Sequence, residues 1–175
     1  MTTDAALEVI HQQLLDDRAA LRAAVDRIPP AQRHVRPAPD RWSCAEVIEH
    51  VAIVETRTAS AMGTLVASAP TQDHNTPTPF DRSKVLDRST RATAPDFIQP
   101  QGKQHFAAAW AALESAWKSI DALMDSYAGR DFTKISREHP FLGHLDGYQW
   151  LNSMGGHERR HAAQILEIAE ALAGR

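Results

Sequence analysis

Residues 146–172 read DGYQWLNSMGGHERRHAAQILEIAEAL, and this stretch carries the pattern that decides the fold. Its apolar residues recur at the three- and four-residue spacing of one helix face: Trp150, Met154, Ile165, Ile168 and Leu172. His157 and His161 continue the same stripe between Met154 and Ile165. We therefore predict a helix over residues 146–172 that buries this face and turns two imidazole rings toward the core.

Three further segments share the helical period and complete an all-α prediction. They span residues 3–28, 44–67 and 103–127. Pro29 ends the first segment, and Ser43 with Glu46 forms a capping box at the start of the second. No stretch has a convincing strand pattern, so we predict no β-structure. The expected fold class is an all-α four-helix bundle, with residues 1–175 in a single domain.

The segment between the second and third predicted helices, residues 68–101, contains five prolines and is too broken for a long helix. A short helical turn near residues 83–87 is compatible with its sequence. Antiparallel neighbours need only a short loop, whereas parallel neighbours need a long crossover of this kind. We therefore predict that helices two and three run parallel, which gives an up-down-down-up order.

The composition argues against several classes of function. Nineteen basic and twenty-two acidic residues include no basic block, so nothing indicates binding to nucleic acid or to an anionic membrane. No secretory signal and no apolar run long enough to span a bilayer is present. Cys44 is the single cysteine, which excludes an internal disulfide and a four-cysteine zinc site. We expect a cytoplasmic protein.

A third histidine joins the predicted pair from another helix. His50 lies between Val47 and Val54 on the apolar face of the second segment, so three imidazoles face one core. Burying a polar ring without a partner costs on the order of 1–3 kcal/mol. Neutral imidazole is a common ligand of zinc, nickel, copper and iron, and three such ligands leave an open position of the kind found in catalytic sites. Core histidines that are hydrogen-bonded to Glu46, Gln164 or the backbone are the alternative.

Residues 157–161, HERRH, also match the zinc-protease pattern H-E-x-x-H, in which the glutamate is the general base. We reject that interpretation. Fourteen residues (162–175) follow His161, which leaves no room for a usual downstream ligand and its supporting structure. No strand is predicted that could bind a substrate at a sheet edge. Glu158 lies beside the apolar stripe, and we expect it to face solvent.

Two stretches together resemble the DinB/YfiT-like superfamily of four-helix-bundle metalloenzymes. Residues 40–50, DRWSCAEVIEH, resemble the W-S-x-x-x-x-x-x-H helix start of that family. Residues 139–143, HPFLG, with 149–151, QWL, and 157–165, HERRHAAQI, resemble its H-P-x-x-G loop and H-x-x-x-H-x-x-Q-I helix. The likeness covers most of the chain in helix order, including the long second connection.

This resemblance implies a metal site at His50, His157 and His161, the up-down-down-up topology, and frequent homodimers. Members of the superfamily with known activity include transferases that join low-molecular-weight thiols to electrophiles, and a thiol-dependent isomerase. The first hypothesis is accordingly a metal-dependent thiol S-transferase acting on small molecules, or a hydrolase that uses metal-activated water. The alternative is a non-catalytic, stress-associated binding or scaffold bundle with a structural metal or none. Zinc or nickel is the first choice of ion, with iron or manganese as alternatives.

Three other residues are candidates for a role near this site. Arg160 could contact an anionic substrate, but a surface salt bridge is the preferred interpretation. His139 in the loop before the last helix could approach the open face of the metal, although turn chemistry also explains that loop. Cys44 lies in the first turn of a helix, where the dipole can lower a thiol pKa, but a small core thiol is the preferred interpretation.

Overall fold

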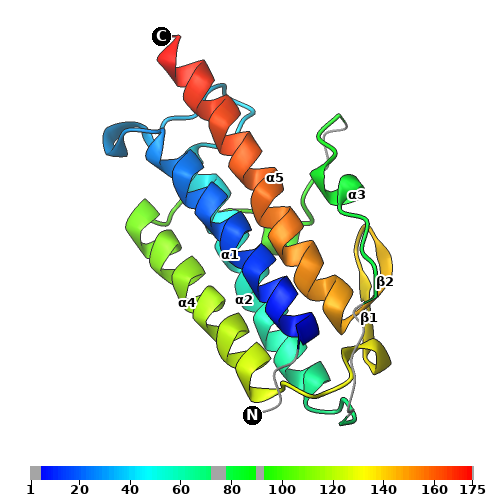
Figure 1. Ribbon diagram of the computed structural model, residues 1–175. Helices are drawn as coiled ribbons and strands as arrows, with labels where there is room; N and C mark the ends of the chain where they lie inside the picture. Colours follow the sequence, from blue (N-terminus) through cyan, green and yellow to red (C-terminus); the bar gives the residue numbers. More distant parts are fainter. Residues whose placement is uncertain (1–4, 72–77, 90–92, 175) are drawn as a thin grey trace.

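The computed structural model describes residues 5–71, 78–89 and 93–174, and four long helices dominate it (Figure 1). They are α1 (Ala5–Asp26), α2 (Cys44–Val66), α4 (Phe106–Ser126) and α5 (Gly147–Ala173). Each lies within two or three residues of its predicted bounds; residues 3 and 4 of the first prediction fall outside the described residues. None of the described helices has the length and apolar character needed to cross a bilayer.

The helices run in the predicted up-down-down-up order. In Figure 1, α1 and α5 rise toward the same end of the bundle, and α2 and α4 descend side by side. The connection between α2 and α4 includes the short helix α3 (Ser83–Leu86), as predicted, and a 3-10 turn, η2 (Asp96–Ile98). Residues 72–77 and 90–92 of this crossover lie outside the described residues. A second 3-10 turn, η1 (Pro30–Gln32), joins α1 to α2.

The helix ends follow the local capping signals. Ser43 Oγ accepts a hydrogen bond from the Glu46 backbone N–H, and Glu46 Oε2 accepts one from the Ser43 backbone N–H, as the sequence predicts. Asp146 and Gln149 form the same reciprocal pair at the start of α5. The start of each histidine-bearing helix is therefore fixed by its own sequence.

The prediction that the chain has no β-structure is wrong. After the 3-10 turn η3 (Phe132–Lys134), β1 (Ser136–His139) pairs with β2 (Gly143–Asp146) in an antiparallel hairpin that leads directly into α5. Seven of the eight strand residues are exposed or half-buried, and only Leu145 is buried. Strands that bury so little leave no apolar alternation in the sequence, which is why pattern reasoning missed them.

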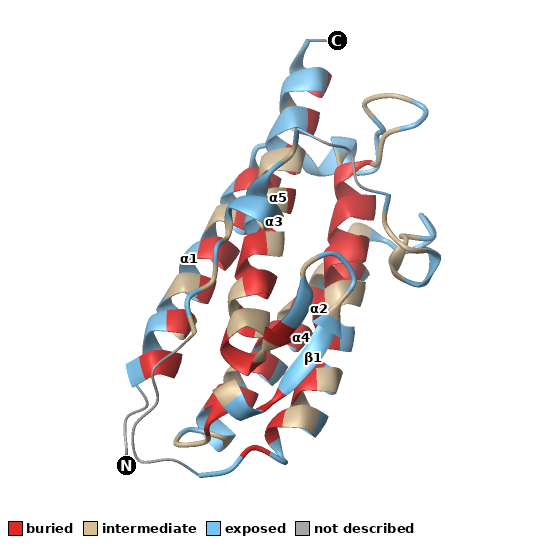
Figure 2. Cartoon of the chain, turned by 90° about the vertical axis from the view of Figure 1, so that its right-hand side faces the viewer, coloured by how far each residue is buried: buried red, intermediate tan, exposed pale blue. Residues whose placement is uncertain are grey.

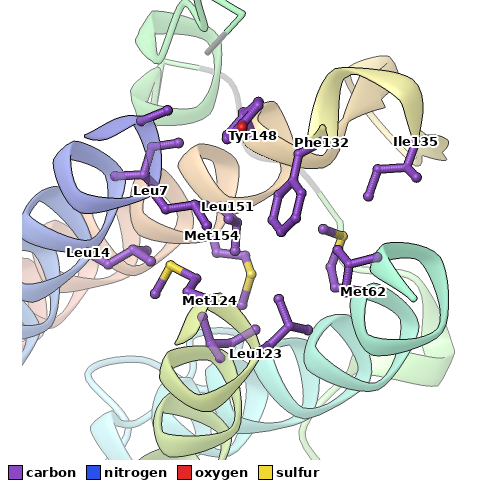
Figure 3. Packing of buried hydrophobic residues seen from close by; sticks show 14 of the residues in the cluster. Leu7, Leu14, Met62, Leu123, Met124, Phe132, Ile135, Tyr148, Leu151 and Met154 are labelled. Atoms are coloured by element: carbon purple, nitrogen blue, oxygen red, sulfur yellow. The ribbon is translucent and has the colours of Figure 1, made fainter. Parts of the chain in front are cut away.

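The core consists of two apolar clusters, one in each half of the bundle. Figure 3 shows the cluster near the start of α1, where Leu7, Leu14, Met62, Phe132 and Leu151 converge. The other cluster includes Leu21, Ile48, Leu113 and Ile165. Buried positions run along the facing sides of the long helices, as Figure 2 shows. A layer of buried charged side chains lies between the two clusters and consists of Arg18 on α1, Glu55 on α2 and Glu158 on α5. Trp117 of the second cluster borders this layer and donates its indole N–H to Glu158.

Candidate metal centre

His50, His157 and His161 converge on one point, as the sequence predicts. His50 comes from α2, whereas His157 and His161 lie one turn apart on α5. His157 Nε2 lies 3.2 Å from His50 Nε2 and 3.0 Å from His161 Nε2. All three ligand atoms lie within 4.8 Å of one another. Among the described residues, no other group of three or more His, Cys, Asp or Glu ligand atoms converges in this way.

Two of the rings are oriented by an acceptor on the side away from this point. His50 Nδ1 lies 2.7 Å from the Ile98 carbonyl oxygen, and His161 Nδ1 lies 2.8 Å from Gln164 Oε1. A carbonyl oxygen can only accept, so each Nδ1 carries the hydrogen and each Nε2 presents a lone pair to the centre. The alternative partners foreseen from the sequence, Gln164 and the backbone, are therefore both used on the Nδ1 side, and the Nε2 atoms of both rings face His157 Nε2.

Burial keeps these imidazoles neutral. His50 and His161 are almost fully buried, and His157 is half-buried. Burial lowers the pKa of His161 to about 3, and the neighbouring His50 contributes to this shift. The pKa of His157 is also well below its ordinary value because of burial and the proximity of His161 and His50. Burial also lowers the pKa of His50, and the hydrogen bond to the Ile98 carbonyl partly offsets this by raising it. Neutral rings are the form that binds metal.

The donor set and its spacing fit a divalent metal ion. Tetrahedral nitrogen ligands at about 2.0–2.1 Å from zinc lie about 3.3 Å from one another. The two nitrogen–nitrogen distances of 3.2 and 3.0 Å are close to this value. Lone pairs aimed at one point repel each other unless a cation or a proton lies between them. The spacing of these nitrogen atoms therefore fits three imidazole ligands of one ion.

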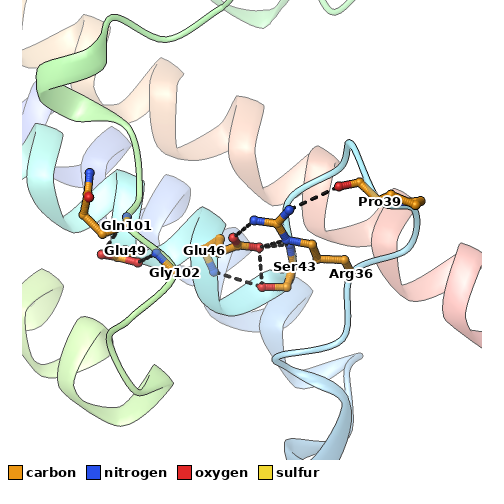
Figure 4. Close-up of polar contacts among 7 residues, drawn as sticks. All are labelled: Arg36, Pro39, Ser43, Glu46, Glu49, Gln101 and Gly102. Carbon is orange, nitrogen blue, oxygen red and sulfur yellow. Dashed lines mark hydrogen bonds and ion pairs between the residues drawn. The ribbon is translucent and has the colours of Figure 1, made fainter.

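The segment that precedes α4 packs over His50. Ile98 at the end of η2 supplies the carbonyl oxygen that orients the His50 ring. Trp42, which precedes α2, also packs on this ring, with the two ring centroids 5.1 Å apart. Figure 4 shows how this segment is attached: Glu49 accepts hydrogen bonds from the backbone N–H groups of Gln101 and Gly102. The same view shows Glu46 bonded to Arg36 and Ser43. Sequence reasoning missed the Ile98 contact, since a backbone carbonyl has no residue signature.

The prediction that Glu158 faces solvent is wrong. Its side chain is fully buried, and Oε1 accepts a hydrogen bond of 2.7 Å from Trp117 Nε1 on α4. The sequence shows one apolar stripe on this helix, but α5 packs against α1 on one side and α2 on another. A residue next to the stripe is consequently also enclosed. The Glu158 carboxylate is held by Trp117 and lies near Glu55 and Arg18 in the polar layer, which agrees with the rejection of a zinc-protease role.

The other candidate residues differ in position. Arg160 donates to the carbonyl oxygens of Val85 and Asp87, so its guanidinium secures the crossover to α5. His139 at the end of β1 lies near enough to contribute to the lowered pKa of His157, and its ring packs 4.9 Å from Trp150. Cys44 is completely buried, and burial raises its pKa to about 12. The core interpretation of this thiol agrees with that burial.

The comparisons with known proteins agree with the fold. The chain is 25% identical over 142 residues to YuaE of Bacillus subtilis (strain 168), covering 78% of this chain and 83% of the relative. TT2238, described as a four-helix bundle protein, matches with a TM-score of 0.53 at 22% identity, over 96% of this chain and 98% of the other. YfiT from Bacillus subtilis matches with a TM-score of 0.53 at 16% identity, over 95% and 87%. YfiT is described as a probable metal-dependent hydrolase with an unusual four-helix bundle topology.

A family model for the DinB superfamily matches residues 13–165. This range takes in the three histidines, the crossover and the hairpin, together with most of the four long helices. The chain belongs to the DinB superfamily.

Proposed function

We propose that His50, His157 and His161 bind one divalent metal ion through their Nε2 atoms and that the protein is a metal-dependent enzyme. The observation that carries this proposal is the convergence of three neutral imidazoles, two of which already use Nδ1 as a donor. When bound, such an ion acts as a Lewis acid and lowers the pKa of a coordinated water or thiol. Zinc or nickel is the first choice, with iron or manganese as alternatives.

Two reactions are compatible with an open three-histidine site. The first is transfer of a low-molecular-weight thiol to a small electrophilic substrate, which is the activity suggested by the sequence resemblance. The second is hydrolysis, which the description of YfiT favours. In either reaction, we propose that His139 exchanges a proton beside the site, because its ring lies near enough to His157 to lower the pKa of that ring. Its Nδ1 accepts the Phe141 backbone N–H, which leaves the hydrogen of the neutral ring on Nε2.

Elemental analysis of tag-free protein tests the metal site. We expect about one divalent ion per chain in the wild type and a large loss of bound metal in His161→Ala. His144→Ala is the matched control, because His144 lies on the exposed hairpin and should keep the ion. Retention of a full equivalent of metal by His161→Ala would contradict the assignment.

Turnover assays separate the reactions once the metal is identified. Metal-loaded protein is incubated with a panel of thiols and electrophiles and, separately, with ester and amide substrates. Metal-dependent product formation that His161→Ala lacks supports an enzyme, and the productive panel names the reaction. If no panel is turned over by protein that holds its ion, the enzyme proposal fails.

A non-catalytic bundle is the second candidate, and one observation favours it. The three histidines come from two different helices, α2 and α5, and an ion between them would hold these helices together. In that case the ion would act as a structural brace.

We also expect a homodimer, which sedimentation equilibrium of the intact protein would detect.

A further inference from the structure

We propose that Glu49 is a positioning residue for the metal centre, because it fastens the crossover segment that aims His50. This inference rests on the proposed metal site and adds a residue that does not contact the ion. The chain of contacts runs from the Glu49 carboxylate to the backbone of Gln101 and Gly102, then along the segment to the Ile98 carbonyl, and from there to His50 Nδ1.

Glu49 uses both carboxylate oxygens for this attachment. Oε1 accepts the Gln101 N–H at 3.0 Å, and Oε2 accepts the Gly102 N–H at 3.1 Å. The residue is only 5% exposed and directly precedes His50 on α2. Hydrogen bonds to a charged acceptor are about twice as strong as neutral ones, and removing such a buried acceptor leaves two amides without a partner. These two hydrogen bonds therefore fix the position of residues 98–102 along α2.

Gly102 makes this close approach possible. Its φ is +66°, a conformation that L side chains rarely adopt, and a Cβ at this position would lie 3.1 Å from Glu46 Oε1. The neighbouring Phe97 also contacts α2, where the Arg57 guanidinium carbon lies 5.1 Å from the centroid of its ring. Three backbone groups of residues 98–102 are hydrogen-bonded to α2, and Glu49 supplies the acceptors for two of them.

The Ile98 carbonyl determines what His50 can do. By accepting from Nδ1 at 2.7 Å, it selects the tautomer whose Nε2 has a free lone pair, and it fixes the rotation of the ring. Loss of a partner of this kind typically lowers metal affinity 10–100-fold. Because Ile98 acts through its backbone, its position depends on what anchors the segment. Binding of the ion and docking of residues 98–102 should accordingly strengthen each other, since such coupling is reciprocal.

The test compares Glu49→Ala and Glu49→Gln with Glu46→Gln as a matched control. Glu46 is a buried carboxylate on the same helix, but it bonds to Arg36 and Ser43 and not to residues 98–102. Zinc affinity is measured by competition with a chromophoric chelator, and the ligand geometry is followed by the visible absorption of bound cobalt(II). We expect Glu49→Ala to bind zinc 10–100-fold more weakly, with an altered cobalt spectrum, and Glu49→Gln to fall between it and the wild type.

Hydrogen exchange supplies an independent measurement. Zinc should slow exchange of the Gln101 and Gly102 amides in the wild type and should fail to do so in His50→Ala. If the wild type binds no divalent ion, the proposed function fails and this inference falls with it. If the wild type binds zinc but both Glu49 variants keep its affinity and cobalt spectrum, only the positioning role is overturned. An equal loss in Glu46→Gln would also overturn it, since general destabilisation would then explain the effect.

Discussion

At the scale of single residues, the polar layer in the middle of the bundle has the most unusual chemistry. Glu55 is 1% exposed, and burial raises its pKa to about 8 although Arg18 acts in the opposite direction. The pKa of Glu158 is also well above its ordinary value because of burial and the nearby Glu55. Asp17 next to this layer is paired with Arg82 and Arg159. Glu55 and Glu158 thus both lie near Arg18, whose single positive charge cannot balance two carboxylates. Protonation of a carboxyl removes the excess negative charge, which burial makes unfavourable.

This arrangement predicts how stability depends on pH. Between the ordinary pKa of 4.5 and about 8, folded Glu55 keeps a proton that the unfolded chain releases. Its contribution to stability is therefore fully present below pH 4.5 and declines as the pH rises toward 8. Glu55→Gln removes this decline, so the variant should gain on the wild type from pH 5 to 8, by up to roughly 4 kcal/mol at about 1.4 kcal/mol for each pH unit.

Urea unfolding of both proteins in EDTA at several pH values provides the measurement. The free-energy difference between variant and wild type reports the coupled pair of Glu55 and Glu158, whose pKa values depend on each other. The buried histidines shift stability in the opposite direction and contribute equally to both proteins, so they cancel in this difference. A difference that stays constant from pH 5 to 8 would show that Glu55 ionises normally in the folded state.

At the scale of elements, the close packing of α1 against α5 depends on a small residue. A Cβ at Gly155 would lie 2.4 Å from Asp17 Oδ2 and 3.2 Å from Leu14 Cδ2. The Asp17 carboxylate cannot readily move, because it is buried and bonded to two arginines. Gly155 therefore allows α5 to approach α1 more closely than any larger residue at this position would permit.

Two alanine substitutions test this view with opposite expected signs. Gly155→Ala should lower the unfolding free energy by about 1–3 kcal/mol, as overpacking does. Gly63→Ala on α2 is the matched control, since a Cβ there meets only Leu123 at 3.9 Å. It should raise the unfolding free energy by about 0.5–1 kcal/mol through helix propensity. Chemical denaturation measures both, and stabilisation by both substitutions would contradict the packing argument.

At the scale of the whole molecule, the bundle consists of two closely packed helix pairs. The most extensive contacts join α1 to α5 and α2 to α4, whereas the contact between α2 and α5 is smaller. The proposed ion would bridge that smaller contact, because His50 belongs to one pair and His157 and His161 to the other. Its binding energy would then be coupled to the assembly of the bundle.

Metal removal should consequently lower thermal stability. At a free zinc concentration 100 times Kd, bound zinc adds about 2.7 kcal/mol, which corresponds to roughly 5–10 °C in Tm for a chain of this size. Calorimetry with zinc and with EDTA should show this difference in the wild type and in His144→Ala, and none in His161→Ala. A wild type that holds one zinc per chain yet melts at the same temperature after chelation would rule out the bridge.

The sequence by itself determined the helices, the long crossover and the helix faces that carry His50, His157 and His161, because these depend on local signals. Helical period, capping pairs and prolines act within a few residues, and His157 and His161 share a face by spacing alone. It could not foretell the burial of Glu158, the hairpin or the Ile98 carbonyl. Those depend on how distant segments pack: a periodic stripe reports one buried face, an exposed hairpin leaves no apolar pattern, and any residue type has a carbonyl oxygen. Only the tertiary structure brings residue 98 to His50 and thereby decides which nitrogen of that ring is presented to a metal ion.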